Sequence, residues 1–193
     1  MVREQSERYF SELKEVLDAL DLDAVERVVD IFLEARKNGK QIFVMGNGGS
    51  GSTASHLACD INKGVGGSLP ERFKVICLND NMPTVLAYAN DMSYEDIFVE
   101  QLKNYLLEGD VVIGISGSGN SGNVLKAVDY ANRCGAVTIG FSGYDGGELA
   151  KVSTVSLNAG VACMQKAEDI HLIVTHLIMQ ILESRLADKS ADS

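Results

Sequence analysis

Two glycine-rich segments hold the residues whose types and spacing point most clearly to chemistry. Residues 46–51 (GNGGSG) and residues 117–122 (GSGNSG) both fit the pattern G-x-G-x-x-G, which is typical of dinucleotide-binding loops. Each segment follows a short apolar run and precedes a helical pattern, so each predicts a loop between a strand and a helix. Glycine at such a loop lets the backbone approach an anion, which the helix N-terminus attracts. Both segments therefore predict anion binding.

Serines in and beside these loops indicate which anion fits. Ser50 lies in the first loop, and Ser116, Ser118 and Ser121 lie in or next to the second. A phosphate monoester presents several terminal oxygens, which hydroxyl groups and backbone N–H groups bind together. Each serine taken alone is equally explained as a helix cap or a turn residue. For the segment SGSGNSG as a whole, we predict a phosphate cup.

A dinucleotide site is the alternative for the first loop. Asp80 follows the second apolar run, where an acid can hold a ribose, but it lies 29 residues beyond Gly51. The spacing expected for that motif is about 20 residues. Neither loop contains Lys or Arg or the G-K-[ST] of a P-loop, so we expect no nucleotide triphosphate hydrolysis. An NAD(P)-linked oxidoreductase stays an alternative hypothesis.

Two histidines and several carboxylates form a second candidate group. His56 and Asp60 are four residues apart on the helix predicted after the first loop, so they share a face. Glu168 lies eight residues before His176 on a long apolar helix, and Asp169 lies seven residues before it. Two histidines with two carboxylates form a ligand set suited to Zn²⁺ or a similar metal.

The histidines also have a structural explanation. A histidine on an apolar helix is commonly a core residue whose nitrogens are satisfied by hydrogen bonds, and the spacing alone does not exclude this. His171 is turned from His176 by about 140° around the helix. We therefore expect His171 to be structural or to support a ligand.

Composition predicts one globular domain with no nucleic acid partner. The chain has 193 residues, 46% hydrophobic and 23% charged, which is ordinary for one domain. A net charge of −10 argues against broad contact with nucleic acid backbones. The N-terminal segment is charged and no apolar run reaches the ~18 residues of a membrane span, so we expect no membrane partner.

The cysteines favour a reducing compartment. No Cys-x-x-Cys is present, and we expect a cytoplasmic location with reduced thiols at Cys59, Cys77, Cys134 and Cys163.

Apolar runs alternate with helical patterns along the chain. Strands are predicted at 41–45, 73–78, 110–115, 136–141 and 154–158, and helices at 2–20, 21–40, 50–62, 82–90, 93–106, 121–135, 146–152 and 166–186. Continuous apolar strands between helices predict an α/β fold with a parallel sheet covered on both faces. We expect one domain over 1–193: a helical segment (1–39) that builds an oligomer interface, an α/β core with a C-terminal helix (40–187), and a frayed tail (188–193).

The motifs together resemble a known family. The segments GNGGSGSTASHLACDI, AYANDMSYEDIF, GDVVIGISGSGNSGNVLKA, GYDGGELA and EDIHLIVTHLIMQILE are similar to the phosphoheptose isomerases of the sugar isomerase (SIS) domain superfamily. The resemblance covers roughly residues 8–185. It implies a three-layer αβα sandwich with a five-stranded parallel sheet and a homotetramer with active sites between subunits. It also implies that the substrate is a sugar phosphate and that sedoheptulose 7-phosphate becomes D-glycero-D-manno-heptose 7-phosphate.

The resemblance also implies roles for individual residues. The substrate-binding positions are Asn47, Gly48, Ser50, Asn90, Asp91, Ser116, Gly117, Ser118, Ser121 and Gln165. The metal-ligand positions are His56, Asp60, Glu168 and His176, with Zn²⁺ as the implied metal. Aldose–ketose isomerisation needs a base, an acid and stabilisation of oxyanion charge. The resemblance assigns Asp60 as the base, His176 as the acid, and Zn²⁺ as the group that polarises the substrate oxygens.

Four positions depart from the family's usual residues. Asp60 stands where Glu is usual, Glu168 where Gln is usual, Gly117 where Thr is common, and Gln165 in place of a substrate-facing Asp. A base one methylene shorter stands about 1 Å farther away, and misplacement of that size costs about 10²-fold in rate. Glu168 adds negative charge that favours a divalent metal. The departures leave open another sugar phosphate, or a non-catalytic SIS module of the replication-initiator-associating type, although both histidines are retained.

Overall fold

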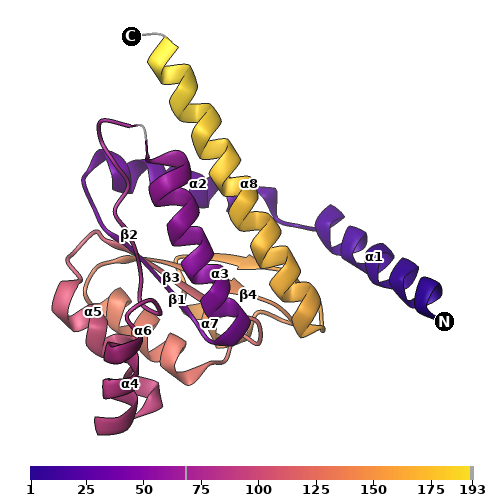
Figure 1. Cartoon of the computed structure of the whole chain (residues 1–193), viewed down its shortest axis with the longest axis horizontal. Helices are drawn as coiled ribbons and strands as arrows, with labels where there is room; N and C mark the ends of the chain where they lie inside the picture. Colours follow the sequence, from indigo (N-terminus) through magenta and orange to yellow (C-terminus); the bar gives the residue numbers. More distant parts are fainter. Residues whose placement is uncertain (68, 192–193) are drawn as a thin grey trace.

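A parallel sheet forms the centre of the molecule. The computed structural model describes residues 1–67 and 69–191 (Figure 1). All strand pairs are parallel, and the order across the sheet is β2-β1-β3-β4-β5. The strands are β1 (Ile42–Gly46), β2 (Val75–Cys77), β3 (Val111–Ser116), β4 (Val137–Ser142) and β5 (Val155–Asn158). All five predicted strands are confirmed, with boundaries that differ by at most two residues.

Helices surround the sheet. They are α1 (Val2–Asp18), α2 (Leu22–Lys37), α3 (Gly48–Cys59), α4 (Met82–Asp91), α5 (Val99–Tyr105), α6 (Gly122–Arg133), α7 (Gly147–Val152) and α8 (Met164–Ala191), with a π-helix η1 (Asp60–Val65) and a 3₁₀-helix η2 (Tyr94–Asp96). The predicted three-layer αβα sandwich with N-terminal helices is confirmed.

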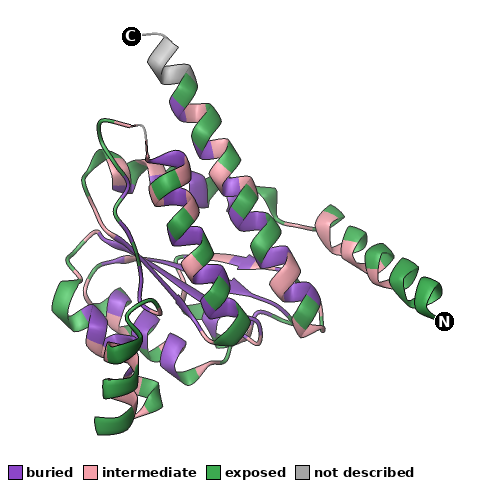
Figure 2. Cartoon of the chain, in the orientation of Figure 1, coloured by how far each residue is buried: buried purple, intermediate pink, exposed green. Residues whose placement is uncertain are grey.

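The central strands β1 and β3 are buried at every position because both faces of the sheet are covered. Ile42 and Val44 of β1 join one core with α2, α3 and α8, whereas Phe43 and Met45 join a second core with α5, α6 and α7. Alternate residues of a strand point to opposite faces, so a strand between two helical layers needs apolar residues at every position. Figure 2 shows the buried residues concentrated on the strands and on the helix surfaces turned toward them.

Helix α2 has a defined residue at each end. The side chain of Asp21 accepts a hydrogen bond from the backbone N–H of Ala24 at 2.9 Å, so Asp21 is the N-cap. Gly39 follows the helix with a φ of +65°, a conformation that glycine adopts without steric cost.

Helix α1 has no buried residue and projects away from the body of the molecule (Figure 1). Its C-terminal part packs on the core through Leu13, Val16 and Leu17. Tyr9 donates a hydrogen bond to Asp169 of α8, and this bond raises the pKa of Tyr9 to about 12. Phe10 stays 59% exposed, so the prediction that this segment builds an oligomer interface stands as a prediction.

Two predicted helices differ in the structure. The predicted helix 93–106 is divided into η2 and α5, because the Ser93 hydroxyl donates to the Asp96 carboxylate at 2.6 Å and forms a local turn there. The predicted helix 50–62 changes at Asp60 from α-helix to π-helix, where the N–H of Gly66 donates to the carbonyl of Ile61 at 2.8 Å. Single π-turns inside helices are frequently found at functional sites.

The C-terminal segment differs from the predicted frayed tail. The frayed tail predicted for 188–193 is helical as far as Ala191, because this segment has no Gly or Pro to end α8; residues 192–193 lie outside the described part of the chain. The segment Met164–Ala187 is also long and apolar enough by composition to cross a membrane. Its apolar stripe is instead buried in the core, along Ala167, Ile170, Val174, Ile178, Leu182 and Leu186.

Candidate active site

The two glycine loops lie side by side at the carboxyl ends of adjacent strands. β1 and β3 are hydrogen-bonded neighbours, with Gly46 paired to Ile115. The chain leaves β1 into α3 on one face of the sheet and leaves β3 into α6 on the other. Open α/β sheets bind ligands at such a switch in connection. The two loops therefore form the walls of a single site.

A pocket of about 280 Å³ lies between these loops. Its lining residues are Asn47, Gly48, Gly49, Ser50, Ile115, Ser116, Gly117, Ser118, Ser121, Met164 and Glu168. Seven of the ten predicted substrate-binding residues are therefore gathered around one cavity. Asn90, Asp91 and Gln165 are exposed and do not contribute to the lining of this pocket.

The serines of the second loop face one another. The Ser116 hydroxyl oxygen lies 2.9 Å from that of Ser121 and 3.5 Å from that of Ser118. Ser121 precedes α6 as its N-cap residue, yet its side chain makes no capping hydrogen bond. Ser50 and Ser116 are buried. Their arrangement fits a cup for phosphate oxygens better than it fits helix capping.

Glycine at position 119 lets the second loop close against a neighbouring loop. Gly119 has a φ of +67°, and a Cβ atom there would lie 2.1 Å from the carbonyl oxygen of Gly146. Gly117 leaves room for a side chain of α8, because a Cβ atom at 117 would lie 2.3 Å from Sδ of Met164. The backbone of the cup is thus held by direct contact with residues around it.

The amide of Asn47 joins the first loop to two other elements. It forms a reciprocal pair with the amide of Asn123 on α6, with both N–O distances 2.9 Å, and its oxygen also accepts the hydroxyl of Tyr94 at 2.9 Å. The sequence interpretation overlooked both partners. The only signal for Asn123 is an amide among apolar residues in the first turn of a helix, two residues after Ser121.

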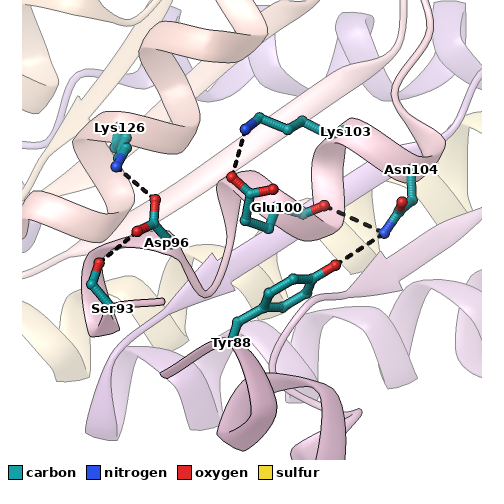
Figure 3. Close-up of polar contacts among 7 residues, drawn as sticks. All are labelled: Tyr88, Ser93, Asp96, Glu100, Lys103, Asn104 and Lys126. Atoms are coloured by element: carbon teal, nitrogen blue, oxygen red, sulfur yellow. Dashed lines mark hydrogen bonds and ion pairs between the residues drawn. The ribbon is translucent and has the colours of Figure 1, made fainter. Parts of the chain in front are cut away.

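Helix α6 and η2 are connected by an ion pair. Lys126 donates to the Asp96 carboxylate at 2.6 Å, and Ser93 donates to the same carboxylate (Figure 3). The bonds from Lys126 and Ser93 lower the pKa of Asp96. The Tyr88 hydroxyl accepts from Asn104 of α5 at 3.4 Å. These contacts fix the segment that carries Tyr94 and the predicted residues Asn90 and Asp91.

Three of the four predicted metal ligands converge. The Nε2 atoms of His56 and His176 lie 2.8 Å apart, and Oδ2 of Asp60 lies 3.1 Å from the first and 3.7 Å from the second. The ligand atoms of this group all lie within 4.8 Å of one another. Two imidazoles and one carboxylate match the protein ligands of catalytic zinc sites, which keep a further position for substrate or water. The donor set therefore fits a divalent metal.

Glu168 lies elsewhere. Its carboxylate is in the serine-lined pocket, against Gly49, where a Cβ atom would lie 2.6 Å from Oε1. Gln165 is exposed at the start of α8, and its side-chain oxygen accepts from the Cys163 thiol at 3.7 Å. Asn90 donates to Asp91 at 2.8 Å on exposed α4. In this chain these residues do not join the three-residue group.

His171 is a buried structural residue. Its Nε2 lies 2.9 Å from the carbonyl oxygen of Ser142, and burial lowers its pKa. It packs beside Phe141 and takes no part in the group around Asp60.

The fold and the site together define a class of protein. A doubly wound sheet, a serine cup at its switch point and a His/Asp group contributed by α3, η1 and α8 are the parts expected of an α/β sugar-phosphate isomerase. Residues 8–143 match the SIS domain model, so the chain belongs to the SIS domain family and, within it, to the phosphoheptose isomerases.

Individual relatives cover most of the chain. A phosphoheptose isomerase from Geotalea uraniireducens is 38% identical over 164 residues, which are 84% of this chain and 85% of the relative. One from Aquifex aeolicus is 31% identical over 97% of this chain and 99% of its own. The structure of a phosphoheptose isomerase from Neisseria gonorrhoeae, 25% identical, has a TM-score of 0.87 and covers 95% of this chain and 100% of its own. This chain is therefore an enzyme of the aldose–ketose isomerase class.

Proposed function

We propose that this enzyme converts sedoheptulose 7-phosphate into D-glycero-D-manno-heptose 7-phosphate. The observation that carries the proposal is the placement of the serine cup and the His/Asp group at the two ends of α3. Ser50 is at the start of this helix and His56 is six residues further, which is about 9 Å along the axis. A heptulose phosphate has its phosphate and its reacting carbons at opposite ends of a long chain, so it suits this separation.

The proposed chemistry uses Asp60 and His176. The Asp60 carboxylate takes a proton from C1 of the ketose, while the imidazole of His176 donates a proton to the carbonyl oxygen at C2. The enediol that forms then returns the hydroxyl proton at C1 to His176, and Asp60 delivers its proton to C2. Both residues end in their starting protonation states. His56, with Nε2 3.1 Å from Oδ2 of Asp60, holds the carboxylate in place.

A divalent metal such as Zn²⁺ fits the same group. His56, Asp60 and His176 would hold it, with Glu168 as the further ligand implied by the family, and it would polarise the substrate oxygens. The serines and the backbone N–H groups at the start of α3 and α6 bind the phosphate. The proposal includes a homotetramer with active sites between subunits, which would bring residues such as Asn90 and Asp91 to a neighbouring pocket, and a cytoplasmic location, in keeping with four free thiols.

A turnover assay tests the proposal. Purified protein with sedoheptulose 7-phosphate and Zn²⁺ should yield the aldose, and a chelator should suppress the reaction. Asp60→Asn and His176→Gln should each abolish turnover while leaving metal-free sugar phosphate binding in place. Cys134→Ser, at a half-exposed position at the C-terminal end of α6, opposite the end that starts at the cup, is the matched control and should keep wild-type activity. Absence of turnover with every heptulose and hexulose phosphate would refute the proposal.

A non-catalytic phosphosugar-binding module is the second candidate. The observation that favours it is the position of Glu168, which lies in the pocket and not with the other three ligands. In that case the protein should bind the sugar phosphate with unchanged affinity after His176→Ala and should show no isomerisation. Measured turnover in the wild type excludes this candidate.

A further inference from the structure

The amide of Asn47 has one free hydrogen-bonding position. Its oxygen accepts two hydrogen bonds, from Nδ2 of Asn123 and from the hydroxyl of Tyr94. Its nitrogen donates one hydrogen bond, to Oδ1 of Asn123. An amide has two acceptor sites and two N–H donors. Among the residues that the structure describes, a single N–H of Asn47 therefore has no protein partner and remains for a ligand in the pocket.

Asn123 is held as firmly as its partner. It is 2% exposed, and its oxygen accepts both the Asn47 amide and the backbone N–H of Val124, each at 2.9 Å. Rotation of either amide would place two oxygens or two N–H groups face to face inside the protein, where an unpaired polar group is destabilising. The pair therefore has one orientation.

The pair connects the two walls of the pocket. Asn47 is the N-cap residue of α3 but makes no capping hydrogen bond, so its amide points across to α6. Asn123 lies two residues beyond the serine cup. One turn further along α6, Lys126 holds Asp96, which is two residues from Tyr94 (Figure 3). Helix α6 thus fixes both partners of Asn47.

We infer that Asn123, assisted by Tyr94, is a positioning residue that makes Asn47 a pure donor toward the substrate and sets the spacing of the two glycine loops. The substrate group opposite Asn47 must then be an oxygen that accepts a hydrogen bond, such as a carbonyl or enediolate oxygen. This inference rests on the proposed function for its catalytic consequence, but the hydrogen-bond arrangement is a property of the free protein.

A double-mutant cycle tests the inference. Asn123→Ala should lower kcat/KM for sedoheptulose 7-phosphate by about tenfold or more in the wild type, but by less than about twofold in the Asn47→Ala background. A residue that only stabilises the fold would cost the same factor in both backgrounds, and that result would overturn the inference. Asp129→Asn, on the exposed surface of α6, is the matched control and should behave as wild type.

Tyr94→Phe provides a second variant that keeps the fold. Tyr94 is exposed and the change removes only the hydroxyl that donates to Asn47, so it tests the same coupling if Asn123→Ala does not fold. We expect a loss of about threefold in kcat/KM, again absent in the Asn47→Ala background. An equal effect in both backgrounds would contradict the inference.

A measurement on the free protein separates this inference from the proposed function. In the NMR spectrum, one side-chain amide hydrogen of Asn47 should exchange slowly with solvent in the wild type and quickly in Asn123→Ala or, if that variant does not fold, in Asn123→Ser. Equal exchange in both proteins would overturn the inference whether or not the wild type isomerises any sugar. Slow exchange in an inactive wild type would leave the inference standing and remove the proposed function.

Discussion

Replacement of Gly119 by alanine should disrupt the phosphate cup, because two separate effects act at this position. The φ of +67° places the residue in the left-handed region, which costs a residue with a Cβ about 1–2 kcal/mol. The new Cβ would also lie 2.1 Å from the carbonyl oxygen of Gly146 and 2.7 Å from its carbonyl carbon. Both are backbone atoms that cannot rotate away, and such overpacking costs a further ~1–3 kcal/mol. The sum is about 2–5 kcal/mol of stability.

Gly48 offers a matched control in the first loop. It has a similar φ of +53°, but a Cβ there would meet nothing within 4 Å. Gly48→Ala should therefore lose only the backbone contribution of about 1–2 kcal/mol. The difference between the two variants isolates the overlap with Gly146.

Denaturant unfolding and calorimetry measure the two consequences. The free energy of unfolding should fall by about 1–3 kcal/mol more in Gly119→Ala than in Gly48→Ala. A folded Gly119→Ala protein should also bind the sugar phosphate at least about tenfold more weakly, since the loop that carries Ser118 must move to relieve the overlap. Equal stabilities of the two variants would refute the steric reasoning, and unchanged affinity would show that the loop does not form the phosphate site.

Three further outcomes are expected. Ser116→Ala should weaken sugar phosphate binding by about tenfold or more in calorimetry, because it removes one hydrogen bond to a charged group. Ser52→Ala is the control: it lies at an exposed position outside the pocket and should change the affinity by less than about twofold. Glu168→Gln should strengthen metal-free binding by at least about fivefold by removing a like charge, and an unchanged affinity would contradict this. The pKa of buried His171 lies below its ordinary value of 6.5, so the unfolded chain takes up a proton that the folded one resists. The free energy of unfolding of the wild type should therefore fall as pH drops below about 6.5, and His171→Phe should lack this part of the decline. If urea unfolding gave both proteins the same slope of unfolding free energy against pH, the prediction would be contradicted.

The sequence was sufficient for the fold because most of the strands, β1 and β3 above all, are short continuous apolar runs. Such runs between amphipathic helices allow little other than a parallel sheet with two covered faces. The placement of the glycine loops at the ends of β1 and β3 followed from the same pattern. The exact course of the chain near Asp60 did not, since the π-helix depends on a bond between Gly66 and Ile61 that no periodicity indicates.

The polar contacts of the site could not be predicted from the sequence, for a different reason. Asn47 and Asn123 are 76 residues apart, and Asn47 and Tyr94 are 47 apart. Contacts at such separation depend on the packing of complete helices. The convergence of His56 with His176, 120 residues apart, was expected only through the resemblance to a family, since spacing along each helix says nothing about the distance between helices.

The departures from the family's usual residues become connected in space. Met164 and Glu168 are four residues apart on α8 and both line the pocket, so they share one face of the helix. The absence of a side chain at Gly117 makes room for Met164, and its absence at Gly49 makes room for Glu168. The carboxylate of Glu168 therefore lies beside the serines that we propose bind a phosphate dianion, and the lining of this pocket has no Lys or Arg. Like charges at close range repel, so this arrangement favours substrate binding only when a cation is bound nearby. His56 on α3, Asp60 at the start of η1 and His176 on α8 offer that cation a place. Metal binding and substrate affinity are then linked more tightly here than in relatives with a neutral residue at position 168.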